Sequence, residues 1–310
     1  MPYFEHPSLS VGPLTVHAFG VVTATAVAVG LWLARRRAGA SGLDLEVHDG
    51  LAWYSLVFGF LGAHVYSVVL YFPEELTRDP FLLFRVWENI SSTGGLLGGA
   101  LGIWVYLGRH RLLLDVRERR LHVDAIAYAL PFAWAIGRLA CTLAHDHPGT
   151  ITTFPLSIEL EAEQAREFVR NVYTGASRAN ELPTAGTLSQ MGFHDLGWYE
   201  FLYLALVAVP IFAYLDRKPR PSGFWVVAFV AVYGPVRFLL DFLRVADSRY
   251  AGLTPAQWAI LAVLLASAAL STSQLTFRSS PAAMKRKLGA RRNAGESLSG
   301  NAASRQCDRS

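Results

Sequence analysis

The stretch VDAIAYALPFAWAIGRLACTLA, residues 123–144, decides the class of this protein. It is long enough to cross the roughly 30 Å of a membrane's hydrocarbon core, which takes about 20 apolar residues as a helix. Arg138 lies inside it, and a guanidinium is costly in hydrocarbon and stays protonated. A charged residue at such a position indicates a functional site, because it must face a polar cavity or an anionic partner.

Six other runs are similarly long and apolar, and together they predict an all-α integral membrane protein with seven transmembrane helices. Hydrophobic residues make up 52% of the 310 residues, charged residues only 17%, and the mean hydropathy is +0.29. Average soluble domains carry about 25% charged residues. The six runs are residues 13–34, 51–72, 90–108, 198–215, 224–242 and 253–275.

The basic residues predict the orientation. With the N-terminus outside and the C-terminus in the cytoplasm, 19 of the 28 Lys and Arg residues fall on the cytoplasmic side, and 7 fall outside. This agrees with the positive-inside rule and predicts a multi-pass membrane protein in that orientation. The same clusters account for the pI near 9, so no nucleic-acid partner is predicted.

Two regions lie outside the apolar runs. We expect residues 1–277 to form the membrane domain, with a small external cap at residues 145–197 between spans four and five. A short helix is expected within residues 157–173 of this cap. The basic tail, residues 278–310, is expected to be disordered and to lie against anionic membrane lipids. Cys141 and Cys307 fall in opposite compartments, so no disulfide is predicted.

A second intramembrane arginine, Arg237, matches the first in depth. Arg138 lies about 16 residues into its span and Arg237 about 14, which places them roughly 24 and 21 Å along two helices that run in the same direction. We therefore expect one shared site, with a lipid phosphate as its ligand. The alternative is a structural role, in which each arginine pairs with a carboxylate such as Asp241 or Glu200.

Helix periodicity adds further residues to this site. Arg237, Asp241 and Arg244 are spaced to share one helix face, as are Arg138, Cys141 and His145. Span one contributes His17. The start of span five brings further polar residues to the same level, namely His194, Asp195, Tyr199 and Glu200.

Several motifs have two readings. The Gly-Gly pairs of 94–99 suit either close helix packing or close approach of a ligand to the backbone. The run HDH (145–147) has too few ligands for a metal site, even with 194–195 nearby, and neither a metal nor a cofactor is predicted. A histidine acting as a general base fits better, since imidazole titrates near neutral pH. Cys141 in an apolar helix is expected to pack rather than to act as a nucleophile.

Taken in order, four segments resemble the prolipoprotein diacylglyceryl transferase family. TGGLLG (93–98) resembles its His-Gly-Gly-Leu-x-Gly segment, and 137–149 resembles its signature Gly-Arg-x-Gly-Asn-Phe-x-Asn-Gly-Glu-x-x-Gly. HDLGWYE (194–200) resembles His-Pro-x-Gln-x-Tyr-Glu. YGPVRFLLDFLR (233–244) resembles Tyr-Gly-x-x-Arg-Phe-x-x-Glu-Phe-x-Arg, the most specific of the four. The similarity runs from about residue 10 to 275.

The resemblance implies transfer of a diacylglyceryl group from phosphatidylglycerol to the lipobox cysteine of a prolipoprotein signal peptide. It also implies a location in the bacterial plasma (inner) membrane. Phosphate binding is then expected from Arg138, Arg237 and Arg244, together with the backbone of Gly94, Gly95 and Gly98. Catalytic roles fall to Arg237, His145, His147, His194 and Tyr199, and Asp241, Asp146 and Glu200 are expected to orient them.

The chain also departs from the family pattern. Thr93 stands where the family has a histidine, Cys141 where it has asparagine, and Asp146 where it has glutamate. The alternative function is therefore a non-catalytic or re-purposed membrane homologue that binds phospholipid or peptide.

Overall fold

The computed structural model describes residues 3, 7–11, 14–110, 114–172, 184–245 and 247–266. A compact unit spans Met1–Leu261, and a second unit begins at Ala262. Of the second unit only residues 262–266 are described, as the end of the helix Pro255–Ala266. The predicted tail and the end of the predicted seventh span lie outside the described residues.

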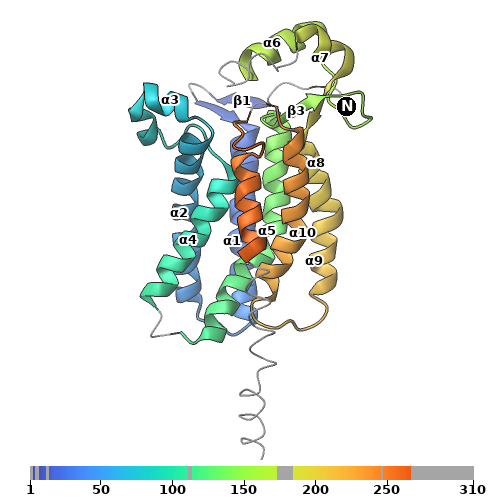
Figure 1. Ribbon diagram of the computed structural model, residues 1–310. Helices are drawn as coiled ribbons and strands as arrows, with labels where there is room; N and C mark the ends of the chain where they lie inside the picture. Colours follow the sequence, from blue (N-terminus) through green and yellow to red (C-terminus); the bar gives the residue numbers. More distant parts are fainter. Residues whose placement is uncertain are drawn as a thin grey trace, which may run out of the picture. The chain divides into compact units, whose positions relative to one another are not determined.

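Within the first unit, long helices lie side by side as a bundle (Figure 1). They are α1 (Ala18–Ala40), α2 (Leu45–Leu70), α4 (Ser92–Arg109), α5 (Val116–Ala144), the continuous α8 (Leu196–Tyr203), η3 (Leu204–Ala208) and α9 (Val209–Leu215), and α10 (Phe224–Leu240) with η4 (Asp241–Leu243). Two short helices, α3 (Pro73–Arg78) and η1 (Pro80–Phe84), connect α2 to α4.

Five of the described helices are long and apolar enough to cross a membrane, which confirms a helical membrane protein. They are α1, α2, α5, Leu196–Leu215 and Phe224–Leu243. The Gly-rich α4 is not among them, and Pro255–Ala266 is shorter. Both coincide with predicted spans, so the count of seven stays a prediction.

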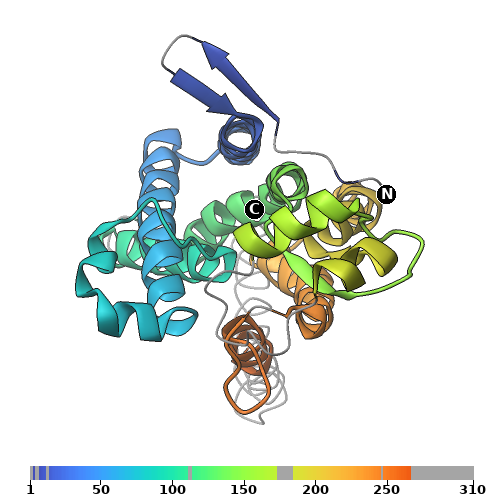
Figure 2. The ribbon, with the colours of Figure 1, turned by 90° about the horizontal axis from the view of Figure 1, so that it is seen from above.

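The first span begins later than the sequence pattern predicted. Residues Ser8–Val11 (β1) and Leu14–His17 (β2) pair as an antiparallel hairpin, and α1 starts only at Ala18. Figure 2 shows this hairpin extending from the end of α1. His17 is therefore the last residue of a strand rather than a residue of the span, because alternating strand pairing takes up the apolar residues before it.

The glycines of α4 allow it to pack directly against α2. A Cβ added at Gly94 would lie 2.4 Å from the Cβ of Tyr66, and one at Gly98 would lie 2.3 Å from the carbonyl oxygen of Phe58. Real Cβ atoms do not approach so closely, so only glycine fits. The structure thus places Gly94 and Gly98 in helix packing, one of their two predicted readings.

A π-helical turn, η3, interrupts the fifth apolar helix just before Pro210. Proline lacks an N–H and its ring clashes with the carbonyl four residues back, so the preceding turn widens. Around this turn lies a buried aromatic core that joins α5, α9 and α10 and includes Phe212, Trp225 and Tyr233. This core holds α10 at the level where Arg237 faces α5.

A small cap covers one end of the bundle, which we call the cap end (Figure 1). It contains β3 (Pro148–Ile151), paired with β4 (Phe193–Asp195), and two helices, α6 (Ala162–Val172) and α7 (Ala185–Met191). It has its own core, formed by residues such as Ile158, Phe168 and Phe193. The predicted short cap helix is confirmed as α6, whereas the strand pair was not predicted.

Candidate active site

Glu200 joins the two predicted arginines. It lies on α8, is 0% exposed, and its carboxylate is 2.9 Å from Arg138 Nε and 2.7 Å from Arg237 Nη1. The hydroxyl of Tyr233 donates a third hydrogen bond to it, at 2.5 Å. The depth calculation is therefore confirmed, because one carboxylate contacts both arginines. The pairing with a carboxylate, which the sequence left as the alternative, is present as well.

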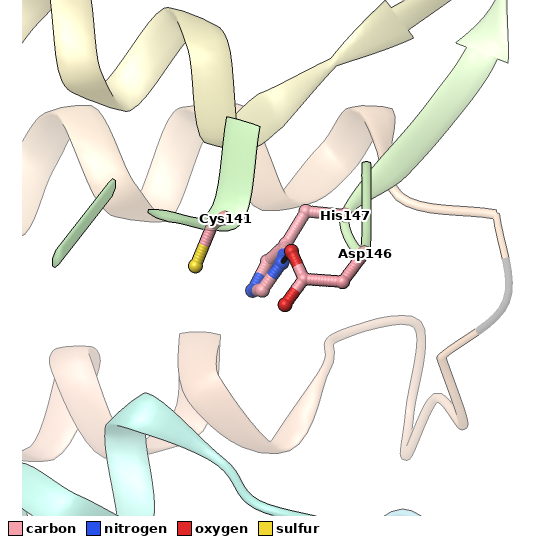
Figure 3. A group of neighbouring side chains, drawn as sticks. All are labelled: Cys141, Asp146 and His147. Atoms are coloured by element: carbon pink, nitrogen blue, oxygen red, sulfur yellow. Dashed lines mark hydrogen bonds and ion pairs between the residues drawn. The ribbon is translucent and has the colours of Figure 1, made fainter. Parts of the chain in front are cut away.

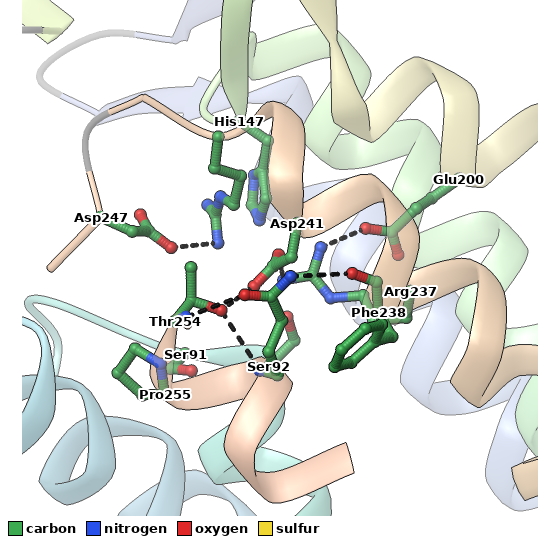
Figure 4. Close-up of polar contacts among 12 residues, drawn as sticks. Ser91, Ser92, His147, Glu200, Arg237, Phe238, Asp241, Asp247, Thr254 and Pro255 are labelled. Atoms are coloured by element: carbon green, nitrogen blue, oxygen red, sulfur yellow. Dashed lines mark hydrogen bonds and ion pairs between the residues drawn. The ribbon is translucent and has the colours of Figure 1, made fainter. Parts of the chain in front are cut away.

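Arg237 has a second acidic partner on its own helix. Its Nη2 lies 2.9 Å from Asp241 Oδ1, four residues on, as the helix periodicity predicted. Asp241 also accepts a hydrogen bond from Thr254, just before the helix that starts at Pro255 (Figure 4). Arg237 is thus held by carboxylates from two sides, with Glu200 and Asp241 buried alongside it.

Arg138 differs, because its two Nη groups contact neutral side chains. Nη2 donates to Ser92 Oγ at the start of α4, at 3.0 Å. Nη1 lies 3.1 Å from His147 Nε2 and 3.7 Å from Cys141 Sγ. These hydrogen bonds lack the strength of an ion pair, so the Nη groups of Arg138 can exchange their partners for an anion more readily than Arg237 can.

The contact with Arg138 determines the tautomer of His147. A guanidinium only donates, so Nε2 of His147 must be the unprotonated, accepting nitrogen. The proton is then on Nδ1, which donates to Asp146 Oδ1. Burial would raise the pKa of Asp146, but His147 and Arg138 beside it lower that pKa below its usual value. The ionised Asp146 therefore orients an imidazole whose basic nitrogen faces the arginine.

Cys141, Asp146 and His147 also bring possible metal ligands together, with ligand atoms within 4.8 Å of one another (Figure 3). Two of the three, the sulfur and Nε2, already contact the Arg138 guanidinium. A divalent cation held there would face a fixed positive charge at the same atoms. The donor set therefore suits a hydrogen-bonded network better than a metal.

His145 is not on the face where the helix spacing placed it. Helix α5 ends at Ala144, and His145 adopts a left-handed conformation with φ +46°. This turns its ring away from the Arg138 face, so that its Nδ1 lies 2.7 Å from Asp195 Oδ2 and its ring stacks on Tyr3. The seven-residue spacing was wrong here because the helix does not continue that far.

Arg244 was predicted from helix periodicity to share a face with Arg237, but it lies just after the end of α10 and η4. The turn η4 ends at Leu243, and Arg244 is extended. Its Nη1 pairs with Asp247 at 2.9 Å rather than with a residue of the arginine pair. Although burial lowers the pKa of Arg244, Asp247 and Asp241 together raise it above its usual value. Asp247 was not predicted as its partner.

His194 and Tyr199 form a separate pair, with Nδ1 2.8 Å from the hydroxyl. Burial lowers the pKa of His194, which favours its neutral form. Tyr199 is next to Glu200, but adjacent helical residues point about 100° apart and so do not face the same partner. Among the described residues, no hydrogen bond or ion pair joins this pair to Arg138, Arg237 or Glu200.

Three residues of the network had no predicted role, namely Tyr233, Ser92 and Trp134. Trp134 Nε1 donates to the Tyr233 hydroxyl at 2.9 Å. The contribution of Tyr233 could have been predicted from the sequence, since Tyr233 precedes Arg237 by four residues and so shares its helix face. For Ser92 the sequence shows only that it is polar and lies at the start of a predicted span. Nothing in the sequence distinguishes Trp134 from the other aromatic residues of the core.

A helical membrane protein with a buried arginine–carboxylate network beneath a small cap is the class that the fold and the site define. The family model for prolipoprotein diacylglyceryl transferase matches residues 7–272. The chain belongs to this family.

Curated relatives carry the name phosphatidylglycerol–prolipoprotein diacylglyceryl transferase. The protein of Chromohalobacter salexigens is 26% identical over 265 residues, which cover 85% of this chain and 88% of the relative. Those of Escherichia fergusonii and Escherichia coli K12 are each 28% identical over 256 residues, covering 81% of this chain and 84% of the relative.

Proposed function

We propose that this protein transfers the diacylglyceryl group of phosphatidylglycerol to the lipobox cysteine of prolipoproteins in the bacterial plasma membrane. Its family and the names of its relatives support this activity. The observation that carries the proposal within this chain is the Arg138–Glu200–Arg237 network, since it provides buried, oriented cations at one depth of the bundle.

We further propose seven spans, with the N-terminus outside and the C-terminus in the cytoplasm. The charge distribution supports this orientation. In this orientation the cap end lies on the outer side of the plasma membrane, where a lipobox cysteine emerges just beyond the apolar segment of a signal peptide.

Arg138 and Arg237 bind the lipid phosphate. Attack at the lipid's glycerol carbon breaks the bond between that carbon and the phosphate ester oxygen, so the departing glycerol phosphate gains a negative charge. Preorganised cations in a water-poor site stabilise such charge strongly. Glu200 and Tyr233 hold the two guanidinium groups in place, and the Nη groups of Arg138 exchange Ser92 and His147 for phosphate oxygens. The backbone of Gly94, Gly95 and Gly98 stays a predicted contributor.

His147 is the general base. Its Nε2 takes the proton of the substrate thiol, the sulfur forms a bond to the glycerol carbon, and glycerol phosphate leaves. Asp146 stabilises the imidazolium that results. Because Nε2 accepts a hydrogen bond from Arg138 before substrate binds, engagement of Arg138 by phosphate frees this nitrogen for the thiol. Lipid binding thereby activates the base.

Of the three histidines predicted as possible bases, His147 is the one whose contacts fit the role best. His145 is held between Asp195 and Tyr3, and His194 is bonded to Tyr199, whereas His147 contacts an arginine of the network. An Asp146–His147 base also offers the proton transfer that Thr93 cannot provide. The second candidate function, a non-catalytic homologue that binds phospholipid or peptide, rests on Thr93 and predicts binding without turnover.

The test uses purified protein in phosphatidylglycerol vesicles with a synthetic lipobox peptide. Mass spectrometry measures the diacylglyceryl adduct on the peptide. We expect an adduct with phosphatidylglycerol, and none with phosphatidylcholine vesicles or with a peptide carrying serine for cysteine. Binding of phosphatidylglycerol without any adduct would instead support the non-catalytic homologue.

A further inference from the structure

A second group of arginines lies at the other end of the bundle, where α1 ends and α5 and α10 begin (Figure 1). We call this the far end. Here the guanidinium of Arg37 lies 3.8 Å from the ring centroid of Tyr128 and 4.7 Å from that of Trp225. It also pairs with Asp216 at 2.8 Å. Arg37 is thus fixed between two aromatic rings, and its charge is paired with that of Asp216.

Arg220 lies in the loop between α9 and α10 and is held differently. Its Nε donates to the carbonyl of Leu215 at 2.8 Å, and its guanidinium lies 4.9 Å from the ring centroid of Phe224. Within the described part of the chain, its two Nη groups have no protein hydrogen-bond partner. The protein therefore orients the Arg220 side chain through Nε, and its Nη groups remain available to donate hydrogen bonds to a ligand.

Both arginines line one cavity of about 200 Å³. A water molecule's share of liquid volume is about 30 Å³, so the cavity has room for a phosphate group. Its lining comes from the end of α1, from α5, from the loop before α10 and from the start of α10. The lining residues are Arg37, Ser41, Leu121, Asp124, Pro219, Arg220 and Trp225.

The acidic residues at this cavity have partners other than Arg220. Asp124 accepts hydrogen bonds from the backbone N–H groups of Gly223, Trp225 and Val226, at 2.6, 3.0 and 3.4 Å. These are the positive end of the α10 dipole. Asp216 pairs with Arg37. Among the described residues, neither carboxylate forms an ion pair with Arg220.

Further basic residues lie close to the cavity. The side chain of Arg120 passes 3.8 Å from the position of a Cβ at Gly223, and Arg217 and Lys218 precede the lining residue Pro219. Basic residues therefore outnumber the acidic residues Asp124 and Asp216 at and beside the cavity. A basic pocket between helix ends is the arrangement that binds phosphate headgroups of lipids.

We propose that this far-end cavity binds a phosphate-bearing anion through Arg220, with Ser41 as a further hydrogen-bond donor. The ligand is a phosphate mono- or diester, carried by an anionic lipid headgroup or free in solution. This site is separate from the arginine–glutamate network and does not depend on the proposed transferase activity.

The experiment compares the full-length wild type with Arg220→Gln. Arg217→Gln is the matched control, because Arg217 lies over the ring of Tyr214 and does not line the cavity. Native mass spectrometry in neutral detergent measures binding of dioleoyl phosphatidic acid, with dioleoyl phosphatidylcholine as the zwitterionic control. A parallel titration uses sodium phosphate as a competitor of the lipid.

We expect Arg220→Gln to weaken phosphatidic acid binding about fivefold, the effect of one basic residue near a membrane surface, and Arg217→Gln to change it less than twofold. Displacement of the lipid by millimolar sodium phosphate assigns the site to free phosphate, and no displacement assigns it to the lipid headgroup. Equal binding by the two variants, or equal binding of the two lipids to the wild type, would overturn the proposal. A matching thermal midpoint for both variants shows that they are folded.

Discussion

Two buried carboxylates, one at each end of the bundle, use the same chemistry in different ways. Glu200 at the cap end accepts hydrogen bonds from the side chains of Arg138, Arg237 and Tyr233. Asp124 at the far end accepts them from three backbone N–H groups at the start of α10. Both link α5 to α10, the first through α8.

The two carboxylates differ in whether their hydrogen-bond donors can also bind a second partner. Backbone N–H groups at a helix start are fixed by the helix, so Asp124 acts as a cap that joins two helices. Arginine side chains carry several donors and can take a second partner while they keep the first. The Glu200 end can therefore hold its arginines and still present them to a phosphate. This contrast predicts that the two ends respond differently to substitution.

After the complete loss predicted below for Arg237→Ala, the largest effect is expected for Arg138→Gln. It removes the cation whose Nη groups are proposed to bind the phosphate, and we expect turnover to fall by about 10³-fold, in the range seen when one charge-stabilising donor is lost. Glu200 keeps Arg237 and Tyr233 as partners, so the fold should persist. The rate of adduct formation, with circular dichroism and gel filtration as folding controls, measures this.

Replacing the proposed base comes next. His147→Asn should lower turnover about 10²-fold or more at pH 7, because the thiol loses its proton acceptor. The loss should shrink as the pH rises toward the usual cysteine pKa of about 8.5, where the thiolate forms without help. Rates measured from pH 6 to 9 test this. His194→Asn, the matched control, should lower the rate less than tenfold, and a reversal of the two results would move the base to His194.

A substitution at the far end should lower the stability of the protein rather than its turnover. Asp124→Ala removes the acceptor for three N–H groups, and we expect it to lower the free energy of unfolding by about 1–2 kcal/mol, as for loss of a helix cap. Turnover per folded molecule should change less than threefold. Thermal unfolding in detergent and the adduct assay measure the two quantities. A severe loss of turnover with normal stability would remove the contrast between the two ends.

The smallest effect is expected for Ser92→Ala. Ser92 holds Arg138 Nη2 by one neutral hydrogen bond, worth about 0.5–1.5 kcal/mol, so turnover should fall less than about tenfold. The adduct assay at saturating phosphatidylglycerol measures this. A loss as large as that of Arg138→Gln would show that Ser92 itself contacts the reacting groups.

The parts of the site that the sequence predicted are those carried by continuous helices. A rise of 1.5 Å per residue was enough to place Arg138 and Arg237 at one depth, and the four-residue spacing was enough to pair Arg237 with Asp241. These estimates need only a continuous helix, and α5 and α10 each run without a break through their arginine.

The errors all fall where a helix ends. His145 was projected along a helix that stops at Ala144, and His17 was assigned to a helix that had not yet begun. Arg244 also lies past its helix but stays within electrostatic range of Asp241 and Asp146, so its phosphate-binding role stays a prediction. The contact of His147 with Arg138 depends on the turn after α5, which no periodic pattern describes. The cap strands β3 and β4 are short and bury residues of a small separate core, so they leave little trace in the sequence.

The most direct test of the central claim, that the Arg138–Glu200–Arg237 network is the transferase site, is the adduct assay on Arg237→Ala. The matched control is Arg78→Ala, a largely exposed arginine outside the site, with 80% of its side chain accessible. We predict no detectable diacylglyceryl adduct on the lipobox peptide with folded Arg237→Ala, and a wild-type rate with Arg78→Ala. Wild-type adduct formation by Arg237→Ala would contradict the account.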